Sequence, residues 1–320
     1  MSKAGDFRFI DNQPTATDMA AEVLAGLSRS PKQISPKYFY DANGSELFEA
    51  ITDLDEYYLT RTELKLFDQH LPAIAERLGD QVCLIEYGSG SSLKIRKVLE
   101  EVTPKAYVPI DISAEHLKEN AWALHQDYPQ LHVYPICADL TQGFDLPEET
   151  KGMTKVGFFP GSSIGNFEPV EAQAFLSVVH DTVGPGGGLI IGVDRKKDTQ
   201  MLERAYNDAR GVTAEFNLNL LRHLNDKLDS DFDPARFQHK AIYNPALGCI
   251  QMFLTSQADQ VVRINGATVA FADQEEVHTE NSYKYHPQEF LDLCARAGFQ
   301  AEASWSDDQD YFSLFLLRAG

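Results

Sequence analysis

The chain has 320 residues, of which 43% are hydrophobic and 11% aromatic, and its formal net charge is −20. This length and apolar content are typical of one large globular domain or two medium ones. A charge this negative disfavours nucleic acid and anionic membrane surfaces as partners. No apolar run is long enough to span a bilayer, and the N-terminal stretch lacks the apolar segment of a signal peptide, so we expect a cytoplasmic protein.

The cysteines and histidines give no signature of a metal or disulfide site. The four cysteines are scattered at Cys83, Cys137, Cys249 and Cys294, with no C-x-x-C spacing, and the nine histidines include no H-x-x-x-H pair. We therefore expect neither a zinc site nor a disulfide framework. Scattered cysteines within apolar stretches also suit a reducing compartment.

Between about residues 61 and 195, short apolar segments alternate with segments of helical spacing. Strands are predicted at 82–86, 106–110, 132–136, 155–159 and 189–193. Helices are predicted at 94–101, 113–128 and 168–183. This alternation predicts a parallel sheet with helices on both faces.

The pattern changes after residue 195. Two helices are predicted within 198–228, and antiparallel strands are predicted at 237–243, 249–255, 261–264, 268–271 and 276–285. A helix at 287–298 and two strands at 300–306 and 311–317 follow. The last two strands are expected to complete the parallel sheet with a hairpin.

These patterns predict an α/β fold with a Rossmann-like sheet, built from residues 61–195 and 286–320. A second α+β unit is inserted at 196–285, and residues 1–60 are expected to pack on it because they offer no strand to the sheet. Ligands of such sheets bind outside the carboxyl ends of the strands. We therefore expect 1–60 and 196–285 to form a substrate-binding lid domain over those ends.

A glycine turn follows the first strand of this sheet, in the run Glu86-Tyr87-Gly88-Ser89-Gly90. Gly88 and Gly90 let the backbone approach a ligand closely, and the next helix points its N-terminus at the same place. A dinucleotide site would need a small residue at position 93, where this chain has Leu93. Glu86 adds a carboxylate that attracts a cation. The pattern favours S-adenosylmethionine, a sulfonium, over NAD, and a tight turn without a ligand remains the alternative.

Acidic residues end three successive strands, namely Glu86, Asp111 and Asp139. Asp111 is placed to accept hydrogen bonds from both ribose hydroxyls, and Asp139 from the adenine amino group. Lys94 is placed to hold the methionine carboxylate. Helix capping or solvation of these side chains remains the alternative for each.

The loop after the fourth strand, residues 160–167, contains two glycines and a proline, and we expect methyl donor and acceptor to meet there. Asn166 can accept a hydrogen bond from an amine and donate one to a carboxylate. The alternative is that Asn166 caps the helix that starts near Glu168. Methyl transfer from a sulfonium is an in-line displacement that needs alignment and exclusion of water rather than a metal or a covalent nucleophile.

Five segments together resemble the histidine Nα-methyltransferases of ergothioneine biosynthesis, which use S-adenosylmethionine. They are 38–48 (YFYDANGSELF), 51–63 (ITDLDEYYLTRTE), 86–92 (EYGSGSS), 160–167 (PGSSIGNF) and 279–285 (TENSYKY). The resemblance covers essentially the whole chain, and the segments other than the glycine turn are specific to this family. It implies trimethylation of the α-amine of the small-molecule substrate histidine to histidine betaine (hercynine). We expect the protein to be a monomer, although the sequence carries no direct signal of oligomeric state.

The resemblance also implies roles for individual residues. Asn166 holds the amine with help from Tyr57, and Tyr206 binds the substrate carboxylate. Glu280 and Ser282 hydrogen-bond the imidazole. The remaining pocket residues implied are Tyr40, Phe48, Gly161 and Met252. The sequence does not show whether Tyr57 or its neighbour Tyr58 faces the substrate.

The pair at 280 and 282 suits an imidazole on physical grounds. A neutral imidazole carries one donor and one acceptor, an ionised Glu280 only accepts, and Ser282 can do either. Residues i and i+2 of a strand point to the same face. A phenylalanine side chain would leave both groups unpaired. A methyltransferase for another amino acid or small amine, and a regulatory protein that binds S-adenosylmethionine, remain alternatives.

Overall fold

The computed structural model describes residues 5–12, 18–89 and 92–320. The chain divides into two compact units. The first comprises Met1–Thr15, Arg61–Arg195 and Tyr285–Gly320, and the second comprises Ala16–Thr60 and Lys196–Lys284. Among the described residues, no helix combines the length and apolar character needed to cross a membrane.

The first unit contains a nine-stranded sheet with the order β1-β6-β4-β3-β7-β8-β15-β14, in which β5 also pairs with β4. Its parallel strands are β1 (Ile10–Asp11), β3 (Val82–Tyr87), β4 (Ala106–Asp111), β5 (His132–Val133), β6 (Ile136–Cys137), β7 (Thr154–Phe159) and β8 (Gly188–Asp194). The antiparallel pair is β14 (Phe299–Ser306) and β15 (Phe312–Ala319), and β15 pairs with β8. The predicted α/β fold, with a parallel sheet completed by a hairpin, is confirmed.

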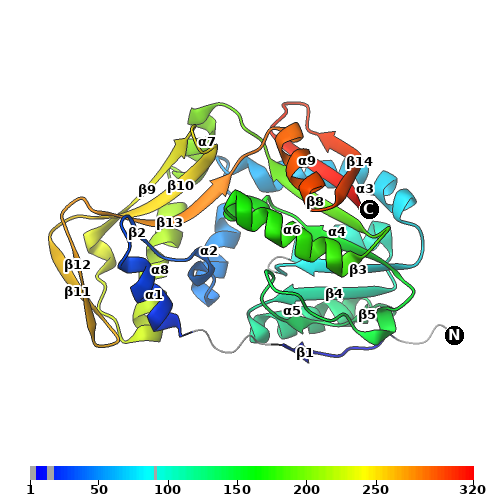
Figure 1. Cartoon of the computed structure of the whole chain (residues 1–320), viewed down its shortest axis with the longest axis horizontal. Coiled ribbons are helices and arrows are strands. Elements are labelled where there is room, and N and C mark those ends of the chain that lie inside the picture. The colour runs from blue at the N-terminus through cyan, green and yellow to red at the C-terminus, as the bar shows by residue number, and fades with distance from the viewer. Residues whose placement is uncertain (1–4, 13–17, 90–91) are drawn as a thin grey trace. The chain divides into compact units, whose positions relative to one another are not determined.

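Helices cover this sheet because its central strands are apolar on both sides. All six residues of β3 are buried, as is typical of a parallel strand between two layers. The helices are α3 (Tyr58–Leu78), α4 (Ser92–Val102), α5 (Ala114–Asp127), α6 (Pro169–Val183) and α9 (Pro287–Arg296). Helix α5 packs on β4, and α6 packs on β7 and on α9, beside which it lies in Figure 1. A short 3-10 helix, η2 (Glu148–Thr150), precedes β7.

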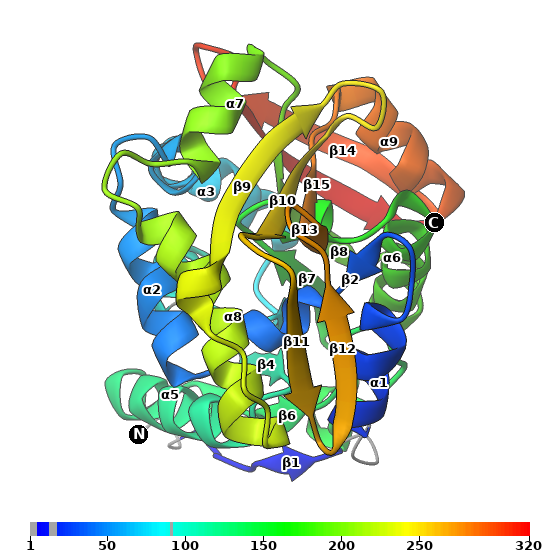
Figure 2. The same ribbon diagram turned by 90° about the vertical axis from the view of Figure 1, so that its left-hand side faces the viewer.

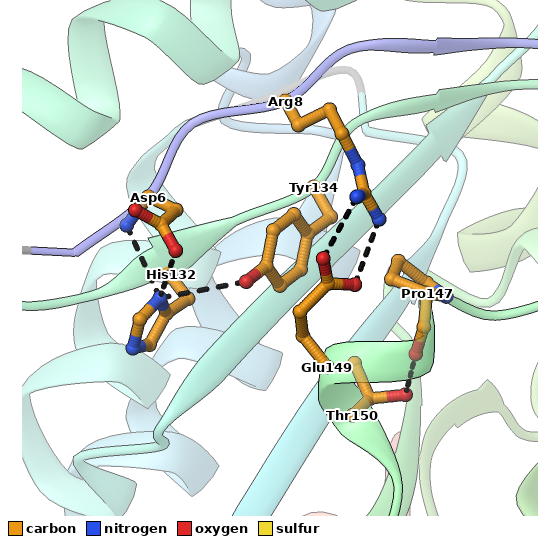
Figure 3. A network of polar contacts seen from close by, with 7 residues as sticks. All are labelled: Asp6, Arg8, His132, Tyr134, Pro147, Glu149 and Thr150. Carbon is orange, nitrogen blue, oxygen red and sulfur yellow. Dashed lines mark hydrogen bonds and ion pairs between the residues drawn. The ribbon is translucent and has the colours of Figure 1, made fainter.

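The N-terminal segment is attached to the edge of this sheet. Strand β1 pairs in parallel with β6. Arg8 forms a bidentate ion pair with Glu149, with N–O distances of 2.7 and 2.8 Å. The backbone N–H of Asp6 donates to His132 Nδ1 at 3.1 Å, and Figure 3 shows both contacts side by side. These contacts fix a strand that is too short to be recognised by alternation.

Two sequence predictions about this sheet were wrong. Residues 1–60 do contribute a strand, because β1 uses the free edge of β6 and is held by side chains distant in sequence. The strand predicted at 132–136 is instead two short strands, β5 and β6. They are separated around Pro135, which has no backbone N–H to donate to a neighbouring strand.

The second unit is an α+β structure. Its four-stranded sheet has the order β2-β13-β10-β9, and a separate hairpin pairs β11 with β12. The strands are β2 (Lys32–Gln33), β9 (Phe237–Asn244), β10 (Cys249–Ser256), β11 (Gln260–Ile264), β12 (Ala267–Phe271) and β13 (Glu276–Tyr283). The helices are α1 (Met19–Leu27), α2 (Ala42–Thr52), α7 (Thr199–Tyr206) and α8 (Val212–Leu228), with 3-10 turns η1 (Pro36–Phe39) and η4 (Pro234–Arg236). Figure 2 shows the β11–β12 hairpin beside α8.

Polar side chains, of which Asn219 is buried, join α8 to α2 in this unit. Asn219 of α8 donates to Asp41 Oδ1 at 2.8 Å and accepts from Asn43 Nδ2 at 2.6 Å. Asp41 also caps α2 by accepting from the Gly44 N–H at 2.7 Å. The contact fixes the start of α2, between Tyr40 and Phe48.

Candidate active site

Three acids lie at one edge of the first unit's sheet. Strands β6, β4 and β3 are neighbours and run parallel, so their carboxyl ends meet at that edge. Glu86 is near the end of β3, Asp111 ends β4, and Asp139 follows β6 by two residues. Asp111 Oδ1 accepts from the Ser113 N–H, and Asp139 Oδ1 from the Thr141 N–H, both at 2.9 Å. The three predicted acids therefore lie at one edge of the sheet. The cofactor groups that they are expected to bind stay predictions.

Glu86 is the buried member of this group. The residue is 2% exposed, and its carboxyl accepts a hydrogen bond from the Tyr107 hydroxyl of β4. Burial raises the pKa of Glu86 to about 8, although the Tyr107 hydrogen bond lowers it. An approaching cation would favour the ionised form. A buried acid with a raised pKa at a strand end is typical of a functional site.

The glycine turn after β3 has the backbone conformation that glycine permits. Gly88 has φ of +78°, and among the described residues a side chain there would contact only Leu140 Cδ1, at 3.8 Å. Its N–H donates to the Ile110 carbonyl at 2.9 Å. The positive φ therefore favours glycine at this position. The predicted Gly90 lies outside the described residues.

The loop after β7 has two successive residues of positive φ, Gly161 at +79° and Ser162 at +62°. The Ser162 Oγ accepts from the Asp194 N–H at 2.9 Å, which fixes the turn to β8. The loop then forms η3 (Ser163–Asn166). The N-cap of α6 is Glu168 rather than Asn166, so the alternative that Asn166 caps this helix is wrong.

Glu63 of α3 fixes the same loop, a role that the sequence analysis missed. Its side chain is fully buried, and its two oxygens accept from the Gly161 N–H at 2.9 and 3.0 Å. Lys94 Nζ lies 2.7 Å from Glu63 Oε2. The ammonium of Lys94 has three protons, so it can bind Glu63 and a second carboxylate at the same time. The expected contact of Lys94 with the carboxylate of a ligand stays a prediction.

A sequence signal for Glu63 exists in the apolar face of α3. Leu59, Leu66 and Phe67 are all buried, and they lie four residues before, three after and four after Glu63. Residues at these spacings share one face of a helix. An acid among them points into the core and needs a partner there.

Aromatic residues of the second unit form a continuous cluster. The ring centroids of Tyr40 and Phe48 are 5.9 Å apart, those of Phe48 and Tyr57 6.4 Å, and those of Tyr57 and Tyr206 6.1 Å. All four were predicted from sequence to contact the substrate. Such a cluster can enclose a small cation or a methylated amine by cation–π attraction.

Of the two adjacent tyrosines, Tyr57 belongs to this cluster. The neighbouring Tyr58 instead accepts a hydrogen bond from Lys197 Nζ at 2.7 Å. Burial raises the pKa of Tyr57 well above its usual value, and the nearby Tyr206 raises it further. The Tyr57 phenol therefore remains protonated near neutral pH.

Strands β10 and β13 bring three further predicted residues together. Met252 is directly opposite Glu280 in the antiparallel register, so their side chains share a face. Ser282 is two residues after Glu280, and its Oγ lies 2.9 Å from the Tyr206 hydroxyl. Burial raises the pKa of Glu280 to about 7, against the opposing effect of Lys284.

Lys284 is the second residue of this region that the sequence analysis missed. It is 1% exposed, and its Nζ donates to the Tyr206 hydroxyl and to Ser282 Oγ, each at 2.9 Å. The Nζ also lies 4.8 Å from the centroid of the Tyr206 ring. The alternation that places Glu280 and Ser282 on one face of the strand places Lys284 on that face as well. This spacing could have identified Lys284 from the sequence.

The edge of the first unit's sheet has hydrogen-bond acceptors of the kind that the ribose and adenine of S-adenosylmethionine need. Carboxylates accept from ribose hydroxyls and from an adenine amino group, and a buried carboxyl suits a nearby sulfonium. The positive-φ glycine at 88 gives the backbone close access, and α4 begins just after this turn. These residues therefore fit the cofactor.

Comparison with known proteins identifies the family. The sequence model of a family described as "Histidine-specific methyltransferase, SAM-dependent" matches residues 19–319. The chain is 38% identical to a histidine N-alpha-methyltransferase of Mycolicibacterium smegmatis over 313 residues, 94% of this chain and 96% of that protein. A Mycobacterium tuberculosis protein of the same name is 37% identical, with 92% and 93% covered.

Similarity extends to a larger fungal protein. The ergothioneine biosynthesis protein 1 of Neurospora crassa is 31% identical over 299 residues, which are 90% of this chain and 33% of that protein. The family match over residues 19–319 includes parts of both structural units, with the strand-end acids and the cluster around Glu280. The chain therefore belongs to the family of histidine-specific, S-adenosylmethionine-dependent methyltransferases.

Proposed function

We propose that this protein transfers three methyl groups from S-adenosylmethionine to the α-amine of L-histidine, producing hercynine in the first step of ergothioneine biosynthesis. The observation that carries the proposal is the buried pair of Glu280 and Ser282 on one face of β13. It occurs in a chain of a histidine-specific family whose relatives include an ergothioneine biosynthesis protein.

Glu280 and Ser282 are proposed to recognise the imidazole ring. An ionised Glu280 accepts from the ring N–H, and Ser282 pairs with the other nitrogen. A phenyl ring would leave both groups unpaired, and a buried polar group without a partner costs about 1–3 kcal/mol. The opposed Met252 would contact the flat face of the ring, and Tyr206 would bind the substrate carboxylate.

The first unit is proposed to bind the methyl donor. S-adenosylmethionine supplies an electrophilic methyl group on a sulfonium. Asp111 and Asp139 would accept from the ribose hydroxyls and the adenine amino group, and Lys94 would hold the carboxylate of the methionine part. The carboxylate of Glu86 would stabilise the positive charge of the sulfonium by electrostatic attraction.

Asn166 and Tyr57 are proposed to hold the amine that is methylated. The carbonyl oxygen of the Asn166 side chain accepts from the amine and directs its lone pair without adding a charge. The Tyr57 phenol stays protonated because burial raises its pKa, so it orients the amine and does not remove its proton. Gly161 is kept in place by Glu63 and shapes the adjacent loop.

Mass spectrometry tests the proposal directly. The purified protein is incubated with S-adenosylmethionine and an equimolar mixture of the twenty amino acids, and histidine alone should gain up to three methyl groups. Glu280→Ala should lower kcat/KM for histidine by about 100-fold, because the ring N–H loses its acceptor. Glu276→Ala is the matched control, since Glu276 is on the same strand but pairs with Lys240.

Two outcomes would contradict the proposal. Methylation of a different amino acid, with Glu280→Ala unaffected, would assign the enzyme to another amine. Tight binding of S-adenosylmethionine without methylation of any amino acid would indicate a regulatory protein.

A further inference from the structure

We infer that the N-terminal segment, residues 5–12, is a positioning element of the cofactor site, and that Arg8 is the positioning residue that fixes it there. The inference rests on the proposed use of S-adenosylmethionine, because the group that the segment positions is Asp139, the expected acceptor for the adenine amino group. All the residues that carry the inference belong to the first unit.

The segment is joined to the edge of the sheet by regular backbone hydrogen bonds. Every second residue donates its N–H to β5, to β6 or to the link between them, at 2.8 to 3.1 Å, namely Arg8 to Val133, Ile10 to Pro135 and Asn12 to Cys137. A Cβ at Gly5 would lie 2.1 Å from the Leu131 carbonyl oxygen, so the two backbones are in direct contact there. The segment is therefore a closely fitted edge strand.

The loop that carries Asp139 is held by this segment at both of its ends. The loop begins where β6 ends, and the last carbonyl of β6 accepts from the Asn12 N–H. It ends at η2, where Glu149 forms the bidentate ion pair with Arg8 that is drawn in Figure 3. The position of the Asp139 carboxylate between these points therefore depends on how the segment holds the two ends.

The opposite face of the segment packs on the helix that follows a second predicted cofactor acid. Side chains alternate along a strand, so Phe7 projects to the face opposite Arg8. Phe7 meets Trp122 of α5 edge to face, with the ring centroids 5.0 Å apart. Helix α5 begins three residues after Asp111. The segment thus contacts the elements that follow both Asp111 and Asp139.

The ion pair of Arg8 with Glu149 offers a way to loosen the segment without disturbing the core. The two side chains are 49% and 43% exposed, so a charge reversed at either position stays in contact with water. Reversal of one charge replaces the attraction by repulsion, and reversal of both restores the attraction.

The test measures how the first unit recognises the adenine amino group. Isothermal titration calorimetry gives the Kd of S-adenosylhomocysteine and of its purine analogue, which lacks only that amino group. The wild-type protein should bind S-adenosylhomocysteine about 10-fold more tightly, because the analogue gives Asp139 no donor. Deletion of residues 1–12 should lower this ratio to within about threefold of unity, mainly by weakening the binding of S-adenosylhomocysteine.

Charge reversal provides a variant with its own rescue. Arg8→Glu should lower the ratio by about twofold or more, and the double variant Arg8→Glu/Glu149→Arg should restore the wild-type ratio. Arg263→Glu is the matched control, because it makes the same change of net charge and breaks an exposed ion pair with Asp231 in the second unit. It should keep the wild-type ratio. These variants carry the comparison even if the deletion variant does not fold.

A second measurement uses the reciprocity of binding and docking. If docking of the segment tightens cofactor binding by some factor, bound S-adenosylhomocysteine must favour docking by the same factor. Hydrogen exchange at the N–H groups of Arg8, Ile10 and Asn12 should therefore slow when S-adenosylhomocysteine is added. Exchange in β14, at the opposite edge of the same sheet, is the reference and should slow less.

The outcomes separate this inference from the proposed function. An unchanged ratio in the deletion variant or in Arg8→Glu, or an equal weakening of both ligands, would overturn the inference and leave the proposed function standing. A wild-type protein without preference for the amino group, a double variant that behaves as Arg8→Glu, or exchange at residues 8–12 that does not respond to S-adenosylhomocysteine would do the same. Failure of the wild-type protein to bind S-adenosylhomocysteine would overturn the proposed function and this inference with it.

Discussion

Fully buried charged residues carry much of the proposed chemistry at the level of single side chains. Glu63, Glu86, Glu280 and Lys284 are each 7% exposed or less. Removal of water from a charged group is costly unless a partner compensates, so each such residue requires a specific neighbour. Glu63 has Lys94 and the Gly161 N–H, and Glu86 has the Tyr107 hydroxyl. These pairs make the two clusters sensitive to single substitutions.

Glu63→Ala should destabilise the protein and lower its activity. It leaves the partly buried Lys94 without its carboxylate and the Gly161 N–H without an acceptor. Loss of one partner of a buried ion pair costs about 3–5 kcal/mol in the free energy of unfolding. Urea denaturation measures this change. Glu76→Ala, an exposed position on the same helix, is the control, and a Glu63→Ala protein as stable as that control would contradict the assigned contact.

Histidine binding should depend on the ionisation of Glu280. Burial raises the pKa of Glu280 to about 7, and only the carboxylate form is a pure acceptor for the ring N–H. KM for histidine should therefore fall as pH rises from about 6 to about 8. In Glu280→Gln, only the titration of histidine itself should remain. Steady-state kinetics across this range compares the two, and identical pH profiles would show that Glu280 does not titrate in the free enzyme.

At the level of elements, continuous apolar runs and alternation predicted most of the fold. Strand β3 is buried along its whole length, and the antiparallel strands of 237–285 appear within a few residues of their predicted bounds. Strand β1 was not predicted because its pairing depends on the edge of β6, which is distant in sequence, and on the contact of Arg8 with Glu149. The roles of Glu63 and Lys284 were not predicted for a different reason. Charged residues are usually solvated, and only their positions on an apolar helix face and on the face of Glu280 indicate otherwise.

A methyl group at residue 161, in the loop between β7 and η3, should lower both the stability and the activity of the protein. It strains the backbone and it also crowds a neighbouring side chain. Gly161→Ala places a Cβ at positive φ and 3.2 Å from Lys94 Nζ. Gly79→Ala has a similar φ of +74°, and no atom of the described residues lies within 4 Å of its Cβ, so it isolates the backbone cost of about 1 kcal/mol. Both variants should lose similar stability by thermal denaturation. Only Gly161→Ala should also lose kcat/KM, and equal activity in the two would exclude a role for this loop.

The stability of the whole molecule should fall as pH rises through neutrality because of Glu86. Its pKa is about 8 in the folded protein, whereas the ordinary pKa of a glutamate carboxyl is 4.5, so between these values the folded state binds more protons than the unfolded state. Stability from this group is complete below about pH 4.5 and decreases until about pH 8. Glu86→Gln should remove this decrease, so its melting temperature relative to wild type should increase with pH. A constant difference from about pH 5 to about pH 8 would contradict the raised pKa.

The alternation of the chain between the two units has a consequence for its synthesis on the ribosome. The first unit's sheet needs β14 and β15, which are made only after the whole insertion of Lys196–Lys284 has emerged. The second unit likewise joins Ala16–Thr60 to segments made more than 130 residues later. Neither unit can be completed early as an independent domain, although domains generally fold as units during translation. Nascent chains stopped before residue 284 should therefore expose the apolar edge of β8 and depend on chaperones, and only chains that extend through β15 should resist proteolysis.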